Sequence, residues 1–167
     1  EWEGHCNGWS SASMLEPEPR ETHYRGGVTF ETADQKGALC EMYMSTYCMF
    51  YGKRYWGSGD DKDDIYPDQF HQLLLDYLGN KKSAIICDTT PDEQVWNYPM
   101  YKFESSWSSG WLNDKRLKVK TTCYYANDDV RPDYLGTKLF SVTYTYNLFI
   151  DDDGDITGGE WTGQSQD

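Results

Sequence analysis

The apolar positions of residues 32–50 recur at helical spacing. Thr32 stands at the predicted start, with Gln35 three positions later as the partner of a capping box. Farther along, methionine and tyrosine side chains return to one side of the helix, which favours packing in a core. We therefore expect an amphipathic helix that continues to Phe50 and ends at Gly52.

Residues 67–78 carry the clearest helical pattern of the chain. Pro67 suits the first turn, and Gly79 suits the position just after the last turn. His71 has leucines three, four and seven positions later, so its side chain points inward or lies at the border of the buried face. The expected apolar stripe consists of Phe70, Leu74, Tyr77 and Leu78, widened by Leu73 and Leu75.

The second half of the chain predicts antiparallel β-strands. Residues 138–150 alternate best, because apolar or aromatic residues occupy every second position and polar residues lie between them. The turn residues Asp152-Asp153-Gly154 then predict a hairpin. Helices followed by strands favour an α+β fold, and 167 residues favour one domain over residues 1–167. The expected strands are residues 83–87, 95–106, 117–125, 138–150 and 156–161.

A cysteine near the start of the chain is the best candidate for a reactive group. Cys6 lies between Gly4 and Gly8, and the small residues that follow, with Met14 and Leu15, predict a short helix. The N-terminus of a helix offers unpaired N–H groups and a positive dipole end, which favour a thiolate. Cys6 is therefore either a nucleophile or an ordinary packed or disulfide-bonded cysteine.

The charge balance narrows the possible partners. The chain has 28 acidic and 15 basic residues and a net charge of −13, which argues against binding nucleic acid or an anionic membrane surface. This balance suits a soluble protein in the extracellular space or in salt water. The cysteine and histidine spacings match no zinc site. Because there are five cysteines, at least one thiol stays outside any intramolecular disulfide, and the sequence leaves open whether the others are bridged.

Three stretches of the chain resemble one protein family. They are residues 2–9 (Trp-Glu-Gly-His-Cys-Asn-Gly-Trp), residues 95–103 (Val-Trp-Asn-Tyr-Pro-Met-Tyr-Lys-Phe) and residues 158–161 (Gly-Gly-Glu-Trp). Together they resemble the transglutaminase-elicitor family, which comprises oomycete cell-wall transglutaminases and their bacterial, notably marine, relatives. The three stretches occur in the same order as in the family and span nearly the whole chain.

The resemblance implies a papain-like domain, in which N-terminal helices precede an antiparallel sheet. It implies that the thiolate of Cys6 attacks a glutamine side-chain amide of a protein substrate, and that a lysine amine resolves the thioester. This chemistry requires no metal or cofactor. The resemblance also implies secretion, and an exposed loop around Trp96 and Pro99 that corresponds to the segment plants perceive.

The general base is less clear than the nucleophile. The resemblance implies a histidine-containing segment after residues 158–161, which this chain lacks, so we expect a chain truncated at one or both ends. Within the chain, we expect His71 to act as the base, oriented by an acid such as Asp88. The alternative is a base outside these 167 residues.

The leading hypothesis is therefore a transglutaminase that takes a glutamine donor protein and a lysine acceptor protein. One alternative is a catalytically inactive papain-like domain, in which the loop from Trp96 to Pro99 recognises a partner. The other alternative is a cysteine peptidase, which uses the same covalent chemistry on a different acyl donor.

Overall fold

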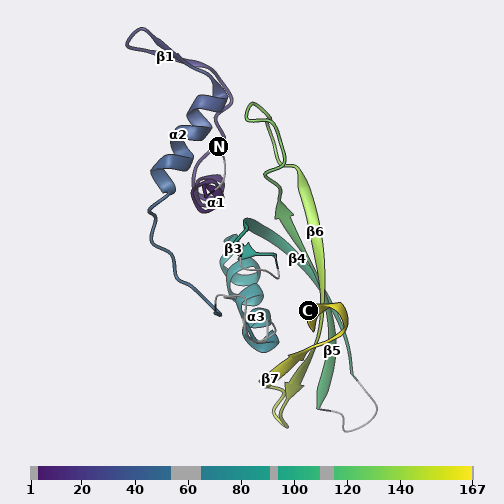
Figure 1. The fold of residues 1–167 in the computed structure, drawn as a ribbon. Coiled ribbons are helices and arrows are strands. Elements are labelled where there is room, and N and C mark those ends of the chain that lie inside the picture. Colours follow the sequence, from purple (N-terminus) through teal and green to yellow (C-terminus); the bar gives the residue numbers. More distant parts are fainter. Residues whose placement is uncertain (1–3, 54–64, 91–93, 110–114, 167) are drawn as a thin grey trace.

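The protein has an α+β fold built on one five-stranded antiparallel sheet, which confirms the predicted class (Figure 1). The computed structural model describes residues 4–53, 65–90, 94–109 and 115–166. The strands lie in the order β3-β4-β5-β6-β7, so neighbours in the chain are neighbours in the sheet. Their bounds confirm the predicted strands to within a few residues: β3 Ile85–Asp88, β4 Asn97–Ser109, β5 Arg116–Ala126, β6 Leu139–Ile150 and β7 Ile156–Trp161.

One face of this sheet carries the hydrophobic core. Val119 of β5 lies opposite Tyr146 of β6, and both side chains are buried. Since successive residues of a strand point to opposite faces, the alternation predicted for β6 places its polar residues on the other face. The core consists of Phe70, Leu74, Leu78, Met100, Val119, Cys123, Tyr125, Tyr146 and Leu148.

A helix covers the core face of the sheet (Figure 1). Helix α3 spans Pro67–Leu73 and continues as a π-helix, η2, over Leu74–Lys81. Its buried residues, Phe70 among them, confirm the predicted apolar stripe. The predicted end at Gly79 is wrong. The π-helical turns carry the chain further, and it leaves the helix at Lys82, whose φ of 55° is left-handed.

Two other helices lie beside the sheet, toward the end where β3 and β4 meet. Helix α1 spans Cys6–Leu15 and begins at the residue predicted to start it. Helix α2 spans Thr32–Tyr43 and packs on α1. Because α1 contacts β4, the first helix connects α2 to the sheet.

Helix α2 differs from its prediction in three ways. It ends at Tyr43, well before Phe50. Its capping box joins Glu31 and Asp34, one residue earlier than expected. Met42 was expected in a core but is 73% exposed, and α2 has no buried residue. The helical spacing was therefore informative, whereas the assignment to a core was wrong, because α2 packs mainly on α1 and the sheet does not cover its other side within the described residues.

A two-stranded hairpin extends from the helices (Figure 1). Its strands are β1, His23–Arg25, and β2, Val28–Phe30, joined by glycines with positive φ. The sequence did not predict this hairpin, because three-residue strands show almost no periodicity. No helix within the described residues is long and apolar enough to cross a membrane.

Candidate active site

The side chain of Cys6 lies at the N-terminus of α1 and faces the start of β4. Its Sγ donates to the backbone oxygen of Val95 at 3.5 Å, and the amide Nδ2 of Asn97 donates to Sγ at the same distance. The first N–H groups of α1 have no helical acceptor, which makes this end of the helix favourable for an anion. The structure therefore places the predicted nucleophile beside a side-chain amide donor.

Asn97 is a site residue that the sequence did not single out. Its backbone oxygen accepts a hydrogen bond of 2.6 Å from Ser10 Oγ, and Ser10 is fully buried in α1. This bond holds the first residue of β4 against α1, one helical turn beyond Cys6. Asn97 lies 91 positions from Cys6 in the chain, so no local pattern could reveal their contact.

Asp88 supports the segment that lies against Cys6. Its Oδ1 accepts hydrogen bonds from the backbone N–H of Trp96 at 3.0 Å and from the hydroxyl of Thr90 at 2.9 Å. Asp88 also lies opposite Asn97 in the pairing of β3 and β4. Its described hydrogen bonds go to this loop, and none goes to an imidazole.

His71 lies in a different part of the molecule. Its Nδ1 lies 2.7 Å from the hydroxyl of Tyr146, whose position in the register is level with Trp107. Trp107 comes ten positions after Asn97 on β4, a separation of about 30 Å along a strand. The structure therefore does not bring His71 together with Cys6 or Asp88. Burial lowers the pKa of His71, because it disfavours the charged ring.

A different histidine directly precedes Cys6 in the chain. His5 is the residue before α1, and its Nε2 lies 2.7 Å from Glu41 Oε1 on α2. Its Nδ1 is buried and has no hydrogen-bond partner, and no other buried side-chain N or O atom among the described residues is in this state. Since the Glu41 carboxylate only accepts, Nε2 donates to it, and in the neutral ring Nδ1 then presents its lone pair. The adjacency of His5 and Cys6 was visible in the sequence, but the contact between His5 and Glu41 was not.

The surface segment around Trp96 and Pro99 is less exposed than predicted. Pro99 is buried within β4, where it lies opposite Ile86. Trp96 is half-buried, and its indole Nε1 donates to Gln94 Oε1 at 3.3 Å. The expectation of an exposed loop is therefore wrong for Pro99, because the strand begins at Asn97 and includes it.

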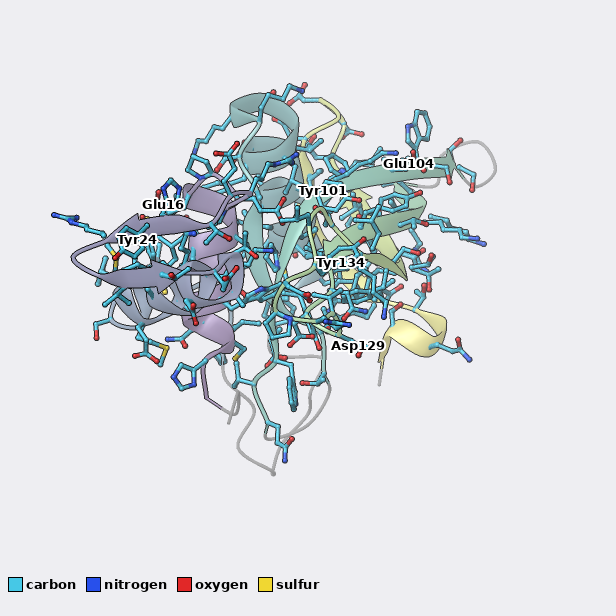
Figure 2. The ribbon with its side chains drawn as sticks, turned by 90° about the horizontal axis from the view of Figure 1, so that it is seen from above. Glu16, Tyr24, Tyr101, Glu104, Asp129 and Tyr134 are labelled. Atoms are coloured by element: carbon cyan, nitrogen blue, oxygen red, sulfur yellow. The ribbon has the colours of Figure 1, made fainter. Side chains whose placement is uncertain are left out.

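A cleft of about 1060 Å³ opens beside Cys6. His5, Cys6 and Trp9 lie at its helical wall, and the segment between β5 and β6 forms the opposite wall. Its two tyrosines are Tyr101 of β4 and Tyr134 of that segment, both labelled in Figure 2. The cleft is large enough for several residues of an extended polypeptide.

The other cysteines differ from Cys6. All five are free thiols. Burial raises the pKa of Cys40 and of Cys87, and raises that of Cys123 to about 12, so these three thiols are poor nucleophiles at neutral pH. Cys48 is exposed. In the described part of the chain, no group of three or more His, Cys, Asp or Glu residues is arranged to hold a metal ion.

Comparison with known proteins then identifies the family. The model of a family described as transglutaminase elicitor matches residues 1–131. This chain belongs to the transglutaminase elicitor family. The matched region contains Cys6, Asn97 beside it and the predicted elicitor segment.

A solved structure shares the fold of this family member. It is the crystal structure of the GP42 transglutaminase from Phytophthora sojae, with a TM-score of 0.77 and 24% sequence identity. The match covers 99% of this chain and 53% of the other, so the chain spans about half the length of that protein. None of the curated proteins compared matches this chain.

Proposed function

We propose that this family member is a protein-glutamine acyltransferase of the transglutaminase type, with Cys6 as the nucleophile. The observation that carries this proposal is the position of Cys6. It lies at a helix N-terminus, at the wall of a cleft of about 1060 Å³, beside the amide of Asn97. A nucleophilic thiolate needs such a partly open site with nearby hydrogen-bond donors.

The reaction proceeds in two acyl transfers. The thiolate of Cys6 attacks the side-chain amide carbon of a substrate glutamine, and the carbonyl oxygen becomes an oxyanion. The backbone N–H of Cys6 and the Nδ2 of Asn97, which lies 3.5 Å from Sγ, are the donors that can stabilise it. Collapse expels the amide nitrogen as ammonia and leaves a thioester. A lysine amine then forms the isopeptide bond and releases the thiolate, whereas water would give glutamate.

The proton acceptor best matched to this chemistry is His5. Its unpartnered Nδ1 and the Cys6 side chain belong to adjacent residues that line the same cleft. Glu41 holds the other ring nitrogen, which fixes the tautomer that leaves Nδ1 able to take the thiol proton and later return it to ammonia. His71 is the base predicted from the sequence. To reach Cys6, its side chain would have to break the hydrogen bond to Tyr146 and move a long distance.

The partners and location follow from this proposal. The substrates are proteins that offer an accessible glutamine and an accessible lysine. The balance of the chain, 28 acidic against 15 basic residues, favours basic, lysine-bearing acceptors over acidic ones. We infer an extracellular site of action, in keeping with the cell-wall members of the family. No step of the reaction draws on a metal or cofactor.

Amine incorporation tests the proposal directly. A casein-type glutamine donor and a fluorescent amine are incubated with the unmodified chain and with four variants: Cys6→Ala, His5→Gln, His71→Gln and His23→Gln. We expect Cys6→Ala to abolish incorporation and His5→Gln to lower it about 100-fold, the usual contribution of a general base. His23 lies in the exposed hairpin and His71 far from the thiol, so these two variants should stay within about twofold of the unmodified chain.

Alkylation by iodoacetamide tests whether Cys6 is a reactive thiolate and whether His5 activates it. Cys6 should react faster at neutral pH than the exposed Cys48, and His5→Gln should remove this advantage without affecting Cys48. Equal rates at both thiols would contradict a catalytic Cys6. Loss of activity in His71→Gln with full activity in His5→Gln would assign the base to His71. Cleavage of the donor without amine incorporation would indicate a peptidase, and neither product would indicate a recognition domain.

A further inference from the structure

The face of the sheet opposite the core carries a row of positive charge. Along β5, Val119 and Thr121 are buried on the core side, so Lys120 between them and the residues in phase with it point to the other face. Arg116, Lys118 and Lys120 occupy alternate positions there and are exposed. Figure 1 shows α3 on the core side of the sheet, so that α3 does not cover this row.

This row stands out against the charge of the whole chain. Three of the 15 basic residues fall within five positions on one strand of a chain with net charge −13. Arg116 lies 3.4 Å from Glu160, and both side chains are about half exposed. Among the described residues, Lys118 and Lys120 take part in no hydrogen bond or ion pair. At least two cations of the central strand are therefore not neutralised by the protein itself.

The row lies in a groove of about 620 Å³. Ser106 and Ser108 of β4 line one side, because they lie opposite Lys120 and Lys118 in the register. Thr145 and Asn147 of β6 line the other side. The floor of the groove thus combines a central line of cations with flanking serine hydroxyls that can bind carboxylates or backbone groups. The hydroxyl of Thr145 donates instead to the backbone oxygen of Thr162, and the amide of Asn147 donates to Glu160.

We propose that this groove binds an extended acidic segment of a partner protein, with carboxylates at every second residue. Cations at alternate positions of a strand are about 6.6 Å apart, and an extended peptide repeats its side chains at the same interval. A carboxylate on every second residue can therefore meet Arg116, Lys118 and Lys120 in turn. The hydroxyls of Ser106 and Ser108 can bond to the peptide backbone between these contacts.

The negative charge of the rest of the molecule favours a short anionic segment over a long polyanion in the groove. A long phosphate polymer or an anionic membrane would also meet the field of a chain with a net charge of −13, which repels it. A short acidic segment of a protein contacts only the row and avoids this repulsion. The proposal does not rest on chemistry at Cys6, because the groove lies on the sheet face and Cys6 lies against the start of β4.

Fluorescence anisotropy of labelled peptides tests this inference. One probe alternates threonine and glutamate over eight residues, and its isomer carries the same four glutamates as one block. The experiment uses the full chain, the double variant Lys118→Gln/Lys120→Gln, and a matched variant Lys53→Gln/Lys81→Gln. Lys53 and Lys81 are exposed and lie outside the groove, so the two variants have the same net charge.

We expect the alternating probe to bind more tightly than the block isomer, and to bind less tightly as salt rises from about 20 to about 200 mM. Loss of two exposed charge contacts in the groove variant should weaken binding about fivefold, with no such loss in the matched variant.

Equal losses in both variants, equal affinity for both probes, or absent binding would each overturn the proposal. Tighter binding of an oligothymidylate of equal charge would assign the groove to phosphate instead. Unchanged Cys6 alkylation in the groove variant shows that the fold and the thiol site are intact.

Discussion

His71 ends a chain of hydrogen-bonded hydroxyl groups whose middle members, Thr121 and Tyr146, are buried. Its Nδ1 lies 2.7 Å from Tyr146 Oη, which lies 2.8 Å from Thr121 Oγ1. Thr121 in turn lies 2.7 Å from Ser105 Oγ. These bonds satisfy polar groups that would otherwise be costly to bury beneath α3. At the scale of single residues, the inward position predicted for His71 reflects a structural hydrogen bond between α3 and β6.

This environment predicts a pH dependence of stability. Burial lowers the pKa of His71 below its ordinary value of 6.5, so the unfolded chain takes up a proton more readily than the folded one. Stability is then complete above about pH 6.5 and is lost as the pH falls below it. We expect His71→Gln to flatten this decrease in the free energy of unfolding, measured by urea denaturation from pH 5 to 8. His23→Gln, in the exposed hairpin, should leave it unchanged, and a flat profile in the unmodified protein would contradict the argument.

At the scale of elements, the contact between α1 and α2 depends on Gly8. A Cβ at this position would lie 2.4 Å from the backbone oxygen of Cys40 and 2.9 Å from the Sδ of Met44. The absence of a side chain lets the two helices approach closely, and this approach brings Glu41 to His5. Gly8 therefore supports the candidate site through packing.

Two glycine substitutions separate packing from helix propensity. Gly8→Ala should destabilise the protein by about 1–3 kcal/mol, because the helices must move apart to admit the methyl group. Gly37→Ala, in α2, should stabilise it by about 0.5–1 kcal/mol, since nothing lies within 4 Å of the added Cβ. Urea denaturation measures both. Equal effects of the two substitutions would show that close packing at Gly8 is unimportant. Gly8→Ala should also slow Cys6 alkylation through the displaced Glu41.

The sequence predicted the elements that have long, regular patterns better than it predicted which other elements they contact. The strand β6 and the apolar stripe of α3 have periods that repeat many times, and both were confirmed. The exposed face of α2 has the same kind of pattern, but only the tertiary arrangement decides whether another element covers it. The site was predictable at Cys6 as a helix start. Its neighbours Asn97 and Glu41 depend on strand register and helix packing, which no local pattern contains.

At the scale of the whole molecule, the ion pair of Glu18 and Lys36 makes hydrogen bonds that fasten the helical part to the far wall of the cleft. The Glu18 carboxylate accepts from the backbone N–H of Gly136 at 2.9 and 3.1 Å, and from Lys36 Nζ at 3.0 Å. Lys36 also donates to the backbone oxygen of Tyr134. Gly136 and Tyr134 belong to the segment between β5 and β6, which lines the cleft opposite Cys6. The width of the cleft is thus fixed by contacts that join distant parts of the chain.

The charge of Glu18 makes this fastening sensitive to acid. Burial alone would raise the pKa of Glu18, but the Gly136 hydrogen bond and the Lys36 ammonium outweigh it and lower the pKa below 4.5. The stabilisation is therefore complete above pH 4.5 and is lost as the pH falls through the lowered value.

Glu18→Gln removes the charge at every pH. Because hydrogen bonds to charged groups contribute about 1.5 kcal/mol or more, we expect about tenfold faster hydrogen exchange at the Gly136 amide at neutral pH. Glu21→Gln is the matched control, since its exposed side chain lies outside the cleft. Equal exchange rates in the two variants would mean that packing alone holds the segment between β5 and β6 in place. The width of the cleft that protein substrates meet would then not change with pH.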